Sequence, residues 1–127
     1  MAIKYSRQRE MILNNLCSRT DHPTADELYI DLKEELPNLS LGTLYRNLAM
    51  LSENGTILKF HCGTSDRFDG NNNLHYHLIC EKCNRLYDLE HAPLTELDEM
   101  FASGYKGKIN SHLLVFYGLC EGCNCSV

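Results

Sequence analysis

Two pairs of cysteines constrain the fold of this chain more than any other feature of its sequence. The first pair is Cys80 and Cys83, and the second is Cys120 and Cys123. Two intervening residues let both thiolates of a pair reach one ion from a tight turn, and two such turns complete a tetrahedron of sulfur ligands, which suits zinc. Because protein sulfur then fills all four positions, the sequence predicts a structural Zn2+ site and not a catalytic one.

The main alternative for these pairs is redox chemistry, in which a pair acts as a dithiol. The sequence has no secretory leader and no run of about 20 apolar residues, so we expect a cytoplasmic protein with no membrane partner. Disulfides are disfavoured in that compartment, and metal binding is the better interpretation of seven cysteines. Cys125 could compete as a ligand but is interpreted as a spare thiol, Cys17 as a small buried hydrophobe, and Cys62 has no assigned role.

The first part of the chain, residues 4–55, carries the periodicity of three helices. Thr24 with Glu27 three residues later forms a capping box for the second helix, and Ser40 is an N-cap for the third. The third helix is predicted to bury a stripe formed by Leu41, Leu44, Leu48 and Leu51.

Two short strands are expected after these helices, near 56–61 and 66–69, around a turn at residues 63–65. Three helices and a small hairpin predict a winged helix-turn-helix, a DNA-binding domain over residues 1–70. The polar, turn-rich residues 71–73 are predicted to be a hinge.

The second part, residues 74–127, has a different period and is predicted to be an α/β domain. Strands are expected at 75–80 and 85–90, and a helix opens at Pro93. The apolar run at 113–117 is interpreted as a strand buried on both faces or as part of a subunit interface. This helix is expected to direct three side chains inward, those of Leu94, Leu97 and Phe101. The chain as a whole is therefore predicted to be α+β.

Two histidines in the first of these strands, His75 and His77, lie two residues apart. Side chains at this spacing point to one face of a strand, so both imidazoles can meet one ion. Asp69, before the hinge, and Asp88, on the neighbouring strand, are carboxylates within reach. Mixed nitrogen and oxygen ligands suit Fe(II), Mn(II) or Zn(II). From spacing alone, ordinary polar residues on an exposed strand face remain the alternative.

Four segments occur in a fixed order with both cysteine pairs: HPTADELY at 22–29, GTLYRNL at 42–48, RFD at 67–69 and HYH at 75–77. Any one of these motifs is weak, but the ordered set is specific. Together they resemble the ferric uptake regulator (Fur) family over nearly the whole chain. The resemblance implies a dimeric, metal-dependent transcriptional repressor whose C-terminal domain, residues 74–127, mediates dimerisation.

The resemblance also implies a regulatory site for Fe2+ or Mn2+ that is separate from the cysteines. Its ligands would be His22, Asp69, His75, His77 and Asp88. Without the resemblance, His22 is an ordinary loop histidine before a proline. An ion shared by both domains would hold the winged helices of a homodimer at the spacing of a palindromic operator in double-stranded DNA, and its loss would free the hinge.

The aspartates at positions 69 and 88 resemble the peroxide-sensing branch of the family, since the iron-uptake and zinc-uptake branches more often carry glutamate at one or both positions. That branch implies that bound Fe2+ reacts with hydrogen peroxide and oxidises His22 or His75, which ends repression without involving the cysteines. Leu74 and Tyr76 stand where the iron-uptake branch can have ligands of an additional site. His112 is therefore interpreted as a plain polar residue of the last strand.

DNA contacts are expected on the outward face of the third helix, at Thr43, Tyr45 and Arg46. The formal charge of −5 does not favour nucleic-acid binding, but charge acts locally. Four further basic residues are predicted to contact phosphates: Arg7, Arg9, Lys59 and Arg67. For Arg46, a solvated helix charge is the alternative.

Two other functions are alternatives to a peroxide-sensing repressor. The first is a repressor of the same family that responds to iron, zinc or manganese availability without peroxide chemistry. The second is a zinc enzyme such as a nucleobase deaminase, which needs a glutamate acid/base in a His-x-Glu motif and a Pro-Cys-x-x-Cys motif. The HYH segment has no such glutamate, and no proline precedes Cys80 or Cys120. We therefore expect a protein that is not an enzyme.

Overall fold

The structure, a computed structural model, describes residues 2–125. This chain divides into two compact units. Unit 1 contains the residues up to Asn72 together with Asn84–Leu86, and unit 2 contains Asn73–Cys83 together with the residues from Tyr87 onward. Within the described residues, no helix is long and apolar enough to cross a bilayer.

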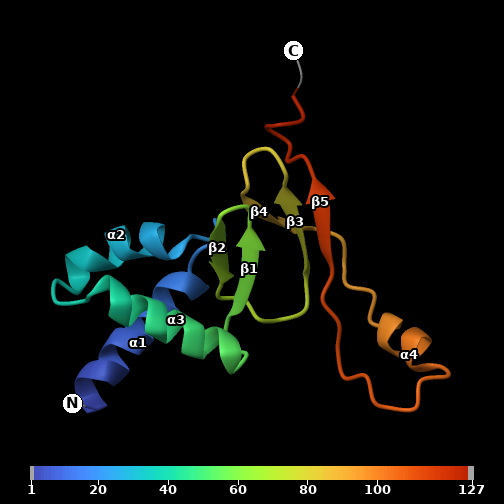
Figure 1. Cartoon of the computed structure of the whole chain (residues 1–127), viewed down its shortest axis with the longest axis horizontal. Helices are drawn as coiled ribbons and strands as arrows, with labels where there is room; N and C mark the ends of the chain where they lie inside the picture. Colours follow the sequence, from blue (N-terminus) through green and yellow to red (C-terminus); the bar gives the residue numbers. More distant parts are fainter. Residues whose placement is uncertain (1, 126–127) are drawn as a thin grey trace. The chain divides into compact units, whose positions relative to one another are not determined.

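Unit 1 is built on three helices, α1 (Ala2–Cys17), α2 (Ala25–Glu35) and α3 (Leu41–Glu53), which Figure 1 shows gathered beside a two-stranded sheet. Apolar side chains at helical spacing meet in one core and remove their surface from water. This core contains Ile12, Leu16, Ala25, Leu28, Leu32, Leu39, Leu44, Leu48, Leu51, Ile57 and Phe68.

One member of the expected leucine stripe lies outside the core. Leu41 is 38% exposed, so its predicted burial is wrong. It is the first residue of α3, and Leu39, two residues earlier, is 1% exposed and fills the core in its place. The N-cap at Ser40 is as predicted, with its side chain accepting a hydrogen bond from the Thr43 amide.

The capping box at the start of α2 is confirmed. The Thr24 hydroxyl accepts from the Glu27 amide at 3.2 Å, and a Glu27 carboxylate oxygen accepts from the Thr24 amide at 2.9 Å. Thr24→Ala removes one of these bonds and should lower the free energy of unfolding by about 0.5–2 kcal/mol. Urea unfolding measures the loss, with Thr20→Ala, an exposed threonine outside the helices, as the control. Equal midpoints for the two variants would contradict this role.

The sheet of unit 1 is an antiparallel hairpin of β1 (Leu58–Cys62) and β2 (Ser65–Asp69). Its register pairs Leu58 with Asp69 at one end and Cys62 with Ser65 at the other. The turn is therefore one residue shorter than predicted, and Gly63 provides its left-handed backbone at φ 69°.

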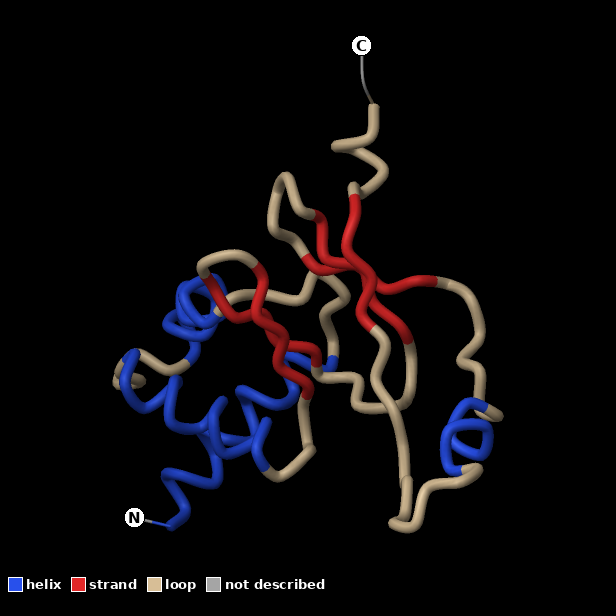
Figure 2. Tube along the Cα trace, turned by 45° about the vertical axis from the view of Figure 1, so that its right-hand side comes forward, coloured by secondary structure: helices blue, strands red, loops and turns tan. Residues whose placement is uncertain are grey.

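Unit 2 contains β3 (Tyr76–Cys80), β4 (Leu86–Leu89) except its first residue, α4 (Leu97–Ala102) and β5 (Val115–Gly118). Its sheet has the order β4-β3-β5, with β3 and β5 parallel from His77 opposite Val115 to Cys80 opposite Gly118. Figure 2 shows β3 and β5 side by side. The carboxyl ends of these two strands therefore meet at one edge of the sheet.

The helix of unit 2 differs from the prediction. It begins at Leu97 and not at Pro93, and it buries no residue. Leu94 is 38% and Phe101 is 70% exposed, so their predicted inward orientation is wrong for the single chain. A helix of six residues has little surface of its own with which to bury an apolar face.

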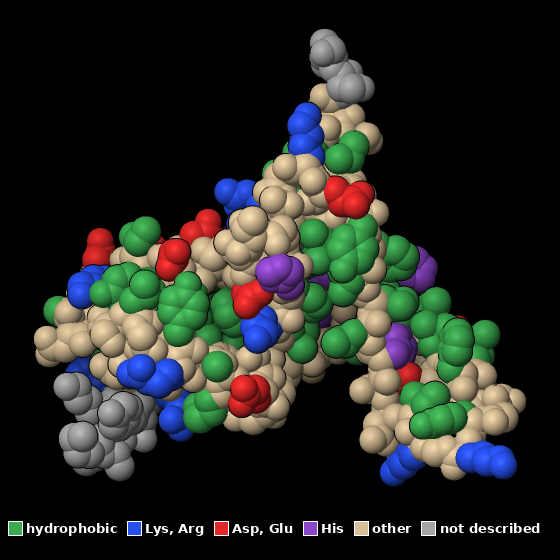
Figure 3. Space-filling model, in the orientation of Figure 1, with side chains coloured by type: hydrophobic (Ala, Val, Ile, Leu, Met, Phe, Trp, Pro, Cys, Tyr) green, Lys and Arg blue, Asp and Glu red, His purple; other side chains and the backbone are tan. Residues whose placement is uncertain are grey.

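The apolar run at 113–117 is not a strand buried on both faces. Phe116 is 49% and Tyr117 is 66% exposed within the described chain. Hydrophobic side chains gather over unit 2 in Figure 3. The large exposed hydrophobic residues of this unit are Tyr87, Leu94, Met100, Phe101, Tyr105, Leu113, Phe116, Tyr117 and Leu119. Such a surface is typical of a protein–protein interface.

Candidate functional site

The four cysteines predicted to bind zinc come together in unit 2. Cys80 ends β3 and Cys120 follows β5, so the parallel strands bring the two pairs to the same edge of the sheet. The four Sγ atoms lie within 4.8 Å of one another. The Sγ atoms of Cys83 and Cys120 are 3.9 Å apart, close to the ~3.8 Å edge of a tetrahedron with Zn–S bonds of about 2.3 Å.

The surroundings of Cys80 and Cys120 favour the thiolate form that binds a metal, whereas hydrogen bonds with the neighbouring cysteine side chains raise the pKa of Cys123 to about 12. Backbone N–H groups of Cys83 and Cys120 lower the pKa of Cys80 to about 6. A hydrogen bond from Tyr87 lowers the pKa of Cys120. Four sulfur donors within 4.8 Å of one another fit Zn2+ and leave no coordination position for a substrate, so the arrangement suits a structural site.

The other three cysteines lie outside this cluster. Cys125 is an exposed thiol, and Cys62 is 2% exposed in β1, where it is a side chain of the hairpin's buried face. Cys17 is exposed at the end of α1, so its predicted burial is wrong.

Unit 2 also brings together three of the predicted nitrogen and oxygen ligands. His75 precedes β3 and His77 lies within it, and their ring centroids are 4.3 Å apart. The Nε2 atoms of His75 and His77 lie 3.1 and 3.2 Å from the same oxygen, Oδ1 of Asp88 on β4. His77 is 1% exposed, and Asp88 is 41% exposed at its side chain. Both imidazoles therefore direct Nε2 toward one point.

Unit 1 holds the other two predicted ligands, His22 and Asp69, and both are buried. His22 Nδ1 lies 3.7 Å from Oδ2 of Asp69, while Oδ1 of Asp69 accepts a hydrogen bond from the Asn71 amide. Gly70 follows directly, and a Cβ at this position would lie 2.7 Å from the backbone of Leu16 and Cys17. Only glycine fits there, so the chain after Asp69 packs closely on the end of α1.

The donor atoms of these histidines and aspartates are, in each unit, imidazole nitrogens and carboxylate oxygens. Such ligands suit Fe2+ and Mn2+, whereas softer metals prefer thiolate ligands. Strand alternation was the signal for His75 and His77, and Asp88 was predicted from its position on the neighbouring strand. For His22 only the family resemblance gave a signal, because a histidine before a proline in a loop has no periodicity to interpret.

A polar network in unit 2 was not anticipated from the sequence. The hydroxyl of Tyr76 lies 2.7 Å from Nε2 of His112 and accepts a hydrogen bond from the Leu94 amide. The Nδ1 atom of His112 lies 2.8 Å from Oδ1 of Asp98 on α4. His112 lies before β5 and not within the last strand as predicted. Its two contacts connect α4 to β3, so its role is larger than that of a plain polar residue.

The predicted DNA-reading residues of α3 lie in two places on unit 1: Thr43 and Arg46 line one depression, whereas the Tyr45 hydroxyl donates to Asp26 at 3.4 Å in another. Tyr45 and Arg46 are exposed on α3, and Arg46 Nη2 donates to the Thr43 hydroxyl at 3.0 Å. Arg9 Nε donates to the Asn47 side chain at 3.3 Å. A depression of about 180 Å³ is lined by Arg9, Thr43, Arg46, Asn47 and Met50. The fold thus brings α1 and α3 residues far apart in the sequence to one basic depression.

The remaining predicted phosphate contacts differ in their surroundings. Lys59 on β1 and Arg7 on α1 are exposed. Arg67 is only 9% exposed, and its guanidinium donates to the carbonyls of His22 and Asn84 and to the Glu27 carboxylate. A phosphate contact would require breaking these bonds, so we no longer expect Arg67 to contact DNA.

The family model of the ferric uptake regulator family matches residues 1–117 of this chain. This match agrees with the fold and the sulfur cluster, and it shows that the chain belongs to the ferric uptake regulator family. Its members are regulators of transcription, so the chain is a regulator and not an enzyme.

Two relatives are peroxide regulators. The chain is 36% identical over 122 residues to the peroxide-responsive repressor PerR of Staphylococcus aureus, covering 95% of this chain and 82% of that protein. The structure matches the peroxide stress regulator of Campylobacter jejuni with a TM-score of 0.84 at 33% identity, covering 95% of this chain and 92% of that one. The ferric uptake regulator Fur of Helicobacter pylori matches in fold, with a TM-score of 0.77 at 21% identity over 94% of this chain and 81% of that one.

Proposed function

We propose that this regulator is a metal-dependent repressor that binds palindromic operator DNA as a homodimer and releases it when hydrogen peroxide oxidises a ligand histidine. The observation that carries the proposal is the convergence of His75 and His77 on one oxygen of Asp88. It occurs in a chain that is 36% identical to a peroxide-responsive repressor. We place the protein in the cytoplasm, as expected from the sequence.

The proposed organisation keeps the domains predicted from the sequence. Residues 1–70 form a winged-helix DNA-binding domain, residues 71–73 a hinge, and residues 74–127 the dimerisation domain. The exposed apolar side chains of unit 2, including Phe101, Phe116 and Tyr117, support a second copy of the chain as the partner.

Two metal sites have separate tasks in this proposal. Cys80, Cys83, Cys120 and Cys123 hold Zn2+ and stabilise the dimerisation domain. His22 and Asp69 of unit 1, with His75, His77 and Asp88 of unit 2, hold one Fe2+ or Mn2+ ion. Because both units would supply ligands, the ion would bind the DNA-binding arrangement more tightly than other arrangements. This difference in affinity would set the population of the active state.

Peroxide sensing would act on the nitrogen donors. A bound Fe2+ would supply the redox chemistry that splits the O–O bond of hydrogen peroxide, so that one oxygen would be added to a ligand imidazole and the other would leave as water; Mn2+ would not supply it. Addition of oxygen to His22 or His75 changes an imidazole donor, so the remaining ligands hold the metal less tightly. Aspartate at both carboxylate positions supports this branch over iron-uptake and zinc-uptake regulators.

A regulator of metal availability is the second candidate function. A zinc-bound manganese uptake regulator matches this fold with a TM-score of 0.58 at 26% identity, over 89% of this chain and 87% of that one. The same donor set would serve such a protein, and only the response to peroxide separates the two functions.

Loading the zinc-containing dimer with Fe2+ or Mn2+ and adding hydrogen peroxide tests the proposal. DNA binding is measured by fluorescence anisotropy, and oxidation is mapped by mass spectrometry. We expect the iron form to lose DNA binding and to gain an oxygen on His22 or His75, while the manganese form keeps its affinity. Equal loss with both metals, or oxidation of cysteine before histidine, would favour a different sensor.

Arg46 is the residue of α3 most suited to contact a base edge. Its exposed guanidinium has five donors, and guanine offers two acceptors in the major groove. We expect Arg46→Ala to weaken operator binding by about 1–3 kcal/mol and to relax specificity at one base position. Lys33→Ala on α2 changes the charge equally and is the control. Wild-type affinity of Arg46→Ala would rule out the contact.

A further inference from the structure

The buried histidine of unit 1 has an unusual backbone. His22 adopts φ 50°, in the left-handed region that residues with a Cβ avoid, and it is followed by Pro23. Neither residue lies in a helix or a β-strand. A conformation of this kind persists only where the surroundings hold it, and such residues cluster at functional sites. The groups that hold His22 therefore determine where its imidazole lies.

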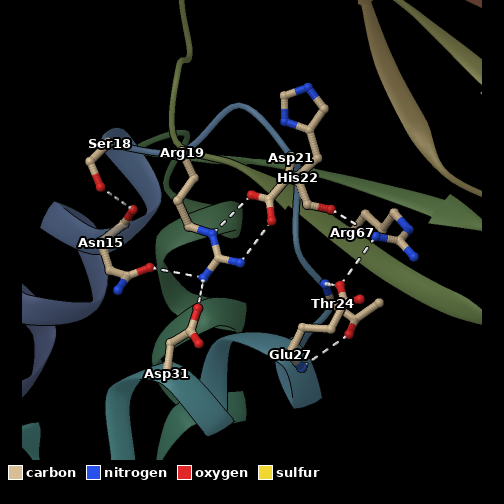
Figure 4. Close-up of polar contacts among 9 residues, drawn as sticks. All are labelled: Asn15, Ser18, Arg19, Asp21, His22, Thr24, Glu27, Asp31 and Arg67. Atoms are coloured by element: carbon tan, nitrogen blue, oxygen red, sulfur yellow. Dashed lines mark hydrogen bonds and ion pairs between the residues drawn. The ribbon is translucent and has the colours of Figure 1, made fainter. Parts of the chain in front are cut away.

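Arg67 is the group that holds the His22 carbonyl. Its Nη1 donates to the His22 carbonyl at 3.1 Å and to Oε1 of Glu27 at 3.2 Å, and its Nε donates to the Asn84 carbonyl at 3.2 Å. Because the guanidinium is planar and rigid, these three acceptors fix its orientation. Figure 4 shows the His22 carbonyl facing Arg67, while the imidazole points away from it.

Glu27 connects this contact to the other side of Pro23. Its Oε1 also accepts from the Thr24 amide at 2.9 Å, so one carboxylate joins Arg67 to the start of α2. The Phe68 amide donates to the Pro23 carbonyl at 3.0 Å, and Thr24 forms a bridge with Arg67. The loop is therefore attached to β2 at His22, Pro23 and Thr24.

The residues before His22 are attached separately. The guanidinium of Arg19 contacts both carboxylate oxygens of Asp21, at 2.9 and 2.8 Å, and its Nη1 contacts Asp31 at 2.6 Å. Figure 4 shows this second arginine on the opposite side of the loop from Arg67. Two arginines thus bracket His22, but only Arg67 bonds to the residue itself.

Arg67 and the ligand Asp69 are two residues apart on β2, and side chains at this spacing share a face of the strand. One strand therefore supplies a carboxylate beside the His22 imidazole and the guanidinium that holds the His22 backbone. We infer that Arg67 is a positioning residue for the regulatory metal, which sets the affinity of the site by fixing His22 against Asp69. This inference rests on the proposed function of His22 as a ligand.

Arg67→Lys tests the inference because it keeps the charge and removes the planar fork. We expect the dissociation constant of Mn2+, measured by titration calorimetry on the full-length zinc-containing protein, to rise about 10- to 100-fold. Zinc content should not change. Arg85→Lys is the matched control, because exposed Arg85 also acts electrostatically on Glu27, whereas the hydrogen bond to the His22 carbonyl comes from Arg67.

A second measurement separates positioning from general destabilisation. In the iron form treated with hydrogen peroxide, the share of oxidation on His22 relative to His75 should fall in Arg67→Lys, since only His22 is held by Arg67. If this variant fails to fold, Glu27→Gln replaces it, because glutamine preserves the capping box and weakens the hold on Arg67. We expect a smaller rise of the Mn2+ dissociation constant for Glu27→Gln.

The outcomes distinguish the inference from the proposed function. Wild-type Mn2+ affinity and a wild-type oxidation ratio in Arg67→Lys would overturn the role of Arg67 and leave the regulatory site intact. Wild-type affinity in a folded Glu27→Gln would do the same where Arg67→Lys does not fold. Absence of Mn2+ binding by the wild-type protein would overturn the regulatory site and the role of Arg67 together.

Discussion

Cys83→Ser should leave unit 2 without zinc and without a stable fold. The side chain of Cys83 is exposed, so serine itself costs little at this position, and the effect measures the lost ligand. Apparent binding free energies of structural zinc reach about 10–16 kcal/mol, whereas whole domains are stable by only about 5–15 kcal/mol. α4 buries no residue and β5 leaves Phe116 and Tyr117 exposed, so the apolar core of unit 2 cannot replace the metal.

Zinc content by mass spectrometry and amide hydrogen exchange across β3 and β5 would measure this loss. We expect near-zero zinc and unprotected amides in unit 2, with protection retained in α2 and α3 of unit 1. Cys125→Ser is the matched control, an exposed cysteine outside the cluster, and should behave as the wild type. A Cys83→Ser protein with full zinc and normal exchange would refute the structural role of the site.

His77→Ala should abolish the stimulation of DNA binding by Mn2+. The side chain of His77 is 1% exposed, with Nε2 at 3.2 Å from Asp88, so alanine removes a buried nitrogen donor from the proposed ligand set. Coupling between effector and ligand sites is commonly worth about 5- to 150-fold in affinity. We expect the operator affinity of this variant to be independent of Mn2+ and equal to that of the metal-depleted wild type.

Anisotropy titrations with and without Mn2+ check the expectation, and urea unfolding shows whether the variant remains folded. His91→Ala, which replaces an exposed histidine of unit 2, should respond to Mn2+ as the wild type does. Continued stimulation of His77→Ala by Mn2+ would remove His77 from the proposed ligand set.

The local features of this fold follow from the sequence because they depend on neighbouring residues. The capping box at Thr24, the N-cap at Ser40 and the hairpin turn at Gly63 each use contacts within a few positions. The cysteine cluster was also predictable, since the spacing within each pair is a local constraint and sulfur chemistry restricts the metal.

Features that depend on distant surroundings could not be predicted in the same way. The periodicity that predicted inward positions for Leu94 and Phe101 contains no information on whether the opposing surface belongs to the same chain. Arg67 is predicted from the sequence to contact a phosphate, because a sequence does not indicate that the His22 and Asn84 carbonyls lie beside it. Buried polar contacts of this kind arise from tertiary structure and leave no period in the sequence.

The parallel pairing of β3 and β5 has a consequence for the order of events during synthesis. Most of unit 1 lies within the first 72 residues, and its helices and hairpin contact near neighbours. The partner of β3 is made more than thirty residues later, and the second cysteine pair follows it. Closing such a loop costs entropy before any contact compensates for it. A nascent chain should therefore fold the helices of unit 1 early, and should complete its zinc site only once Cys120 and Cys123 have left the ribosome.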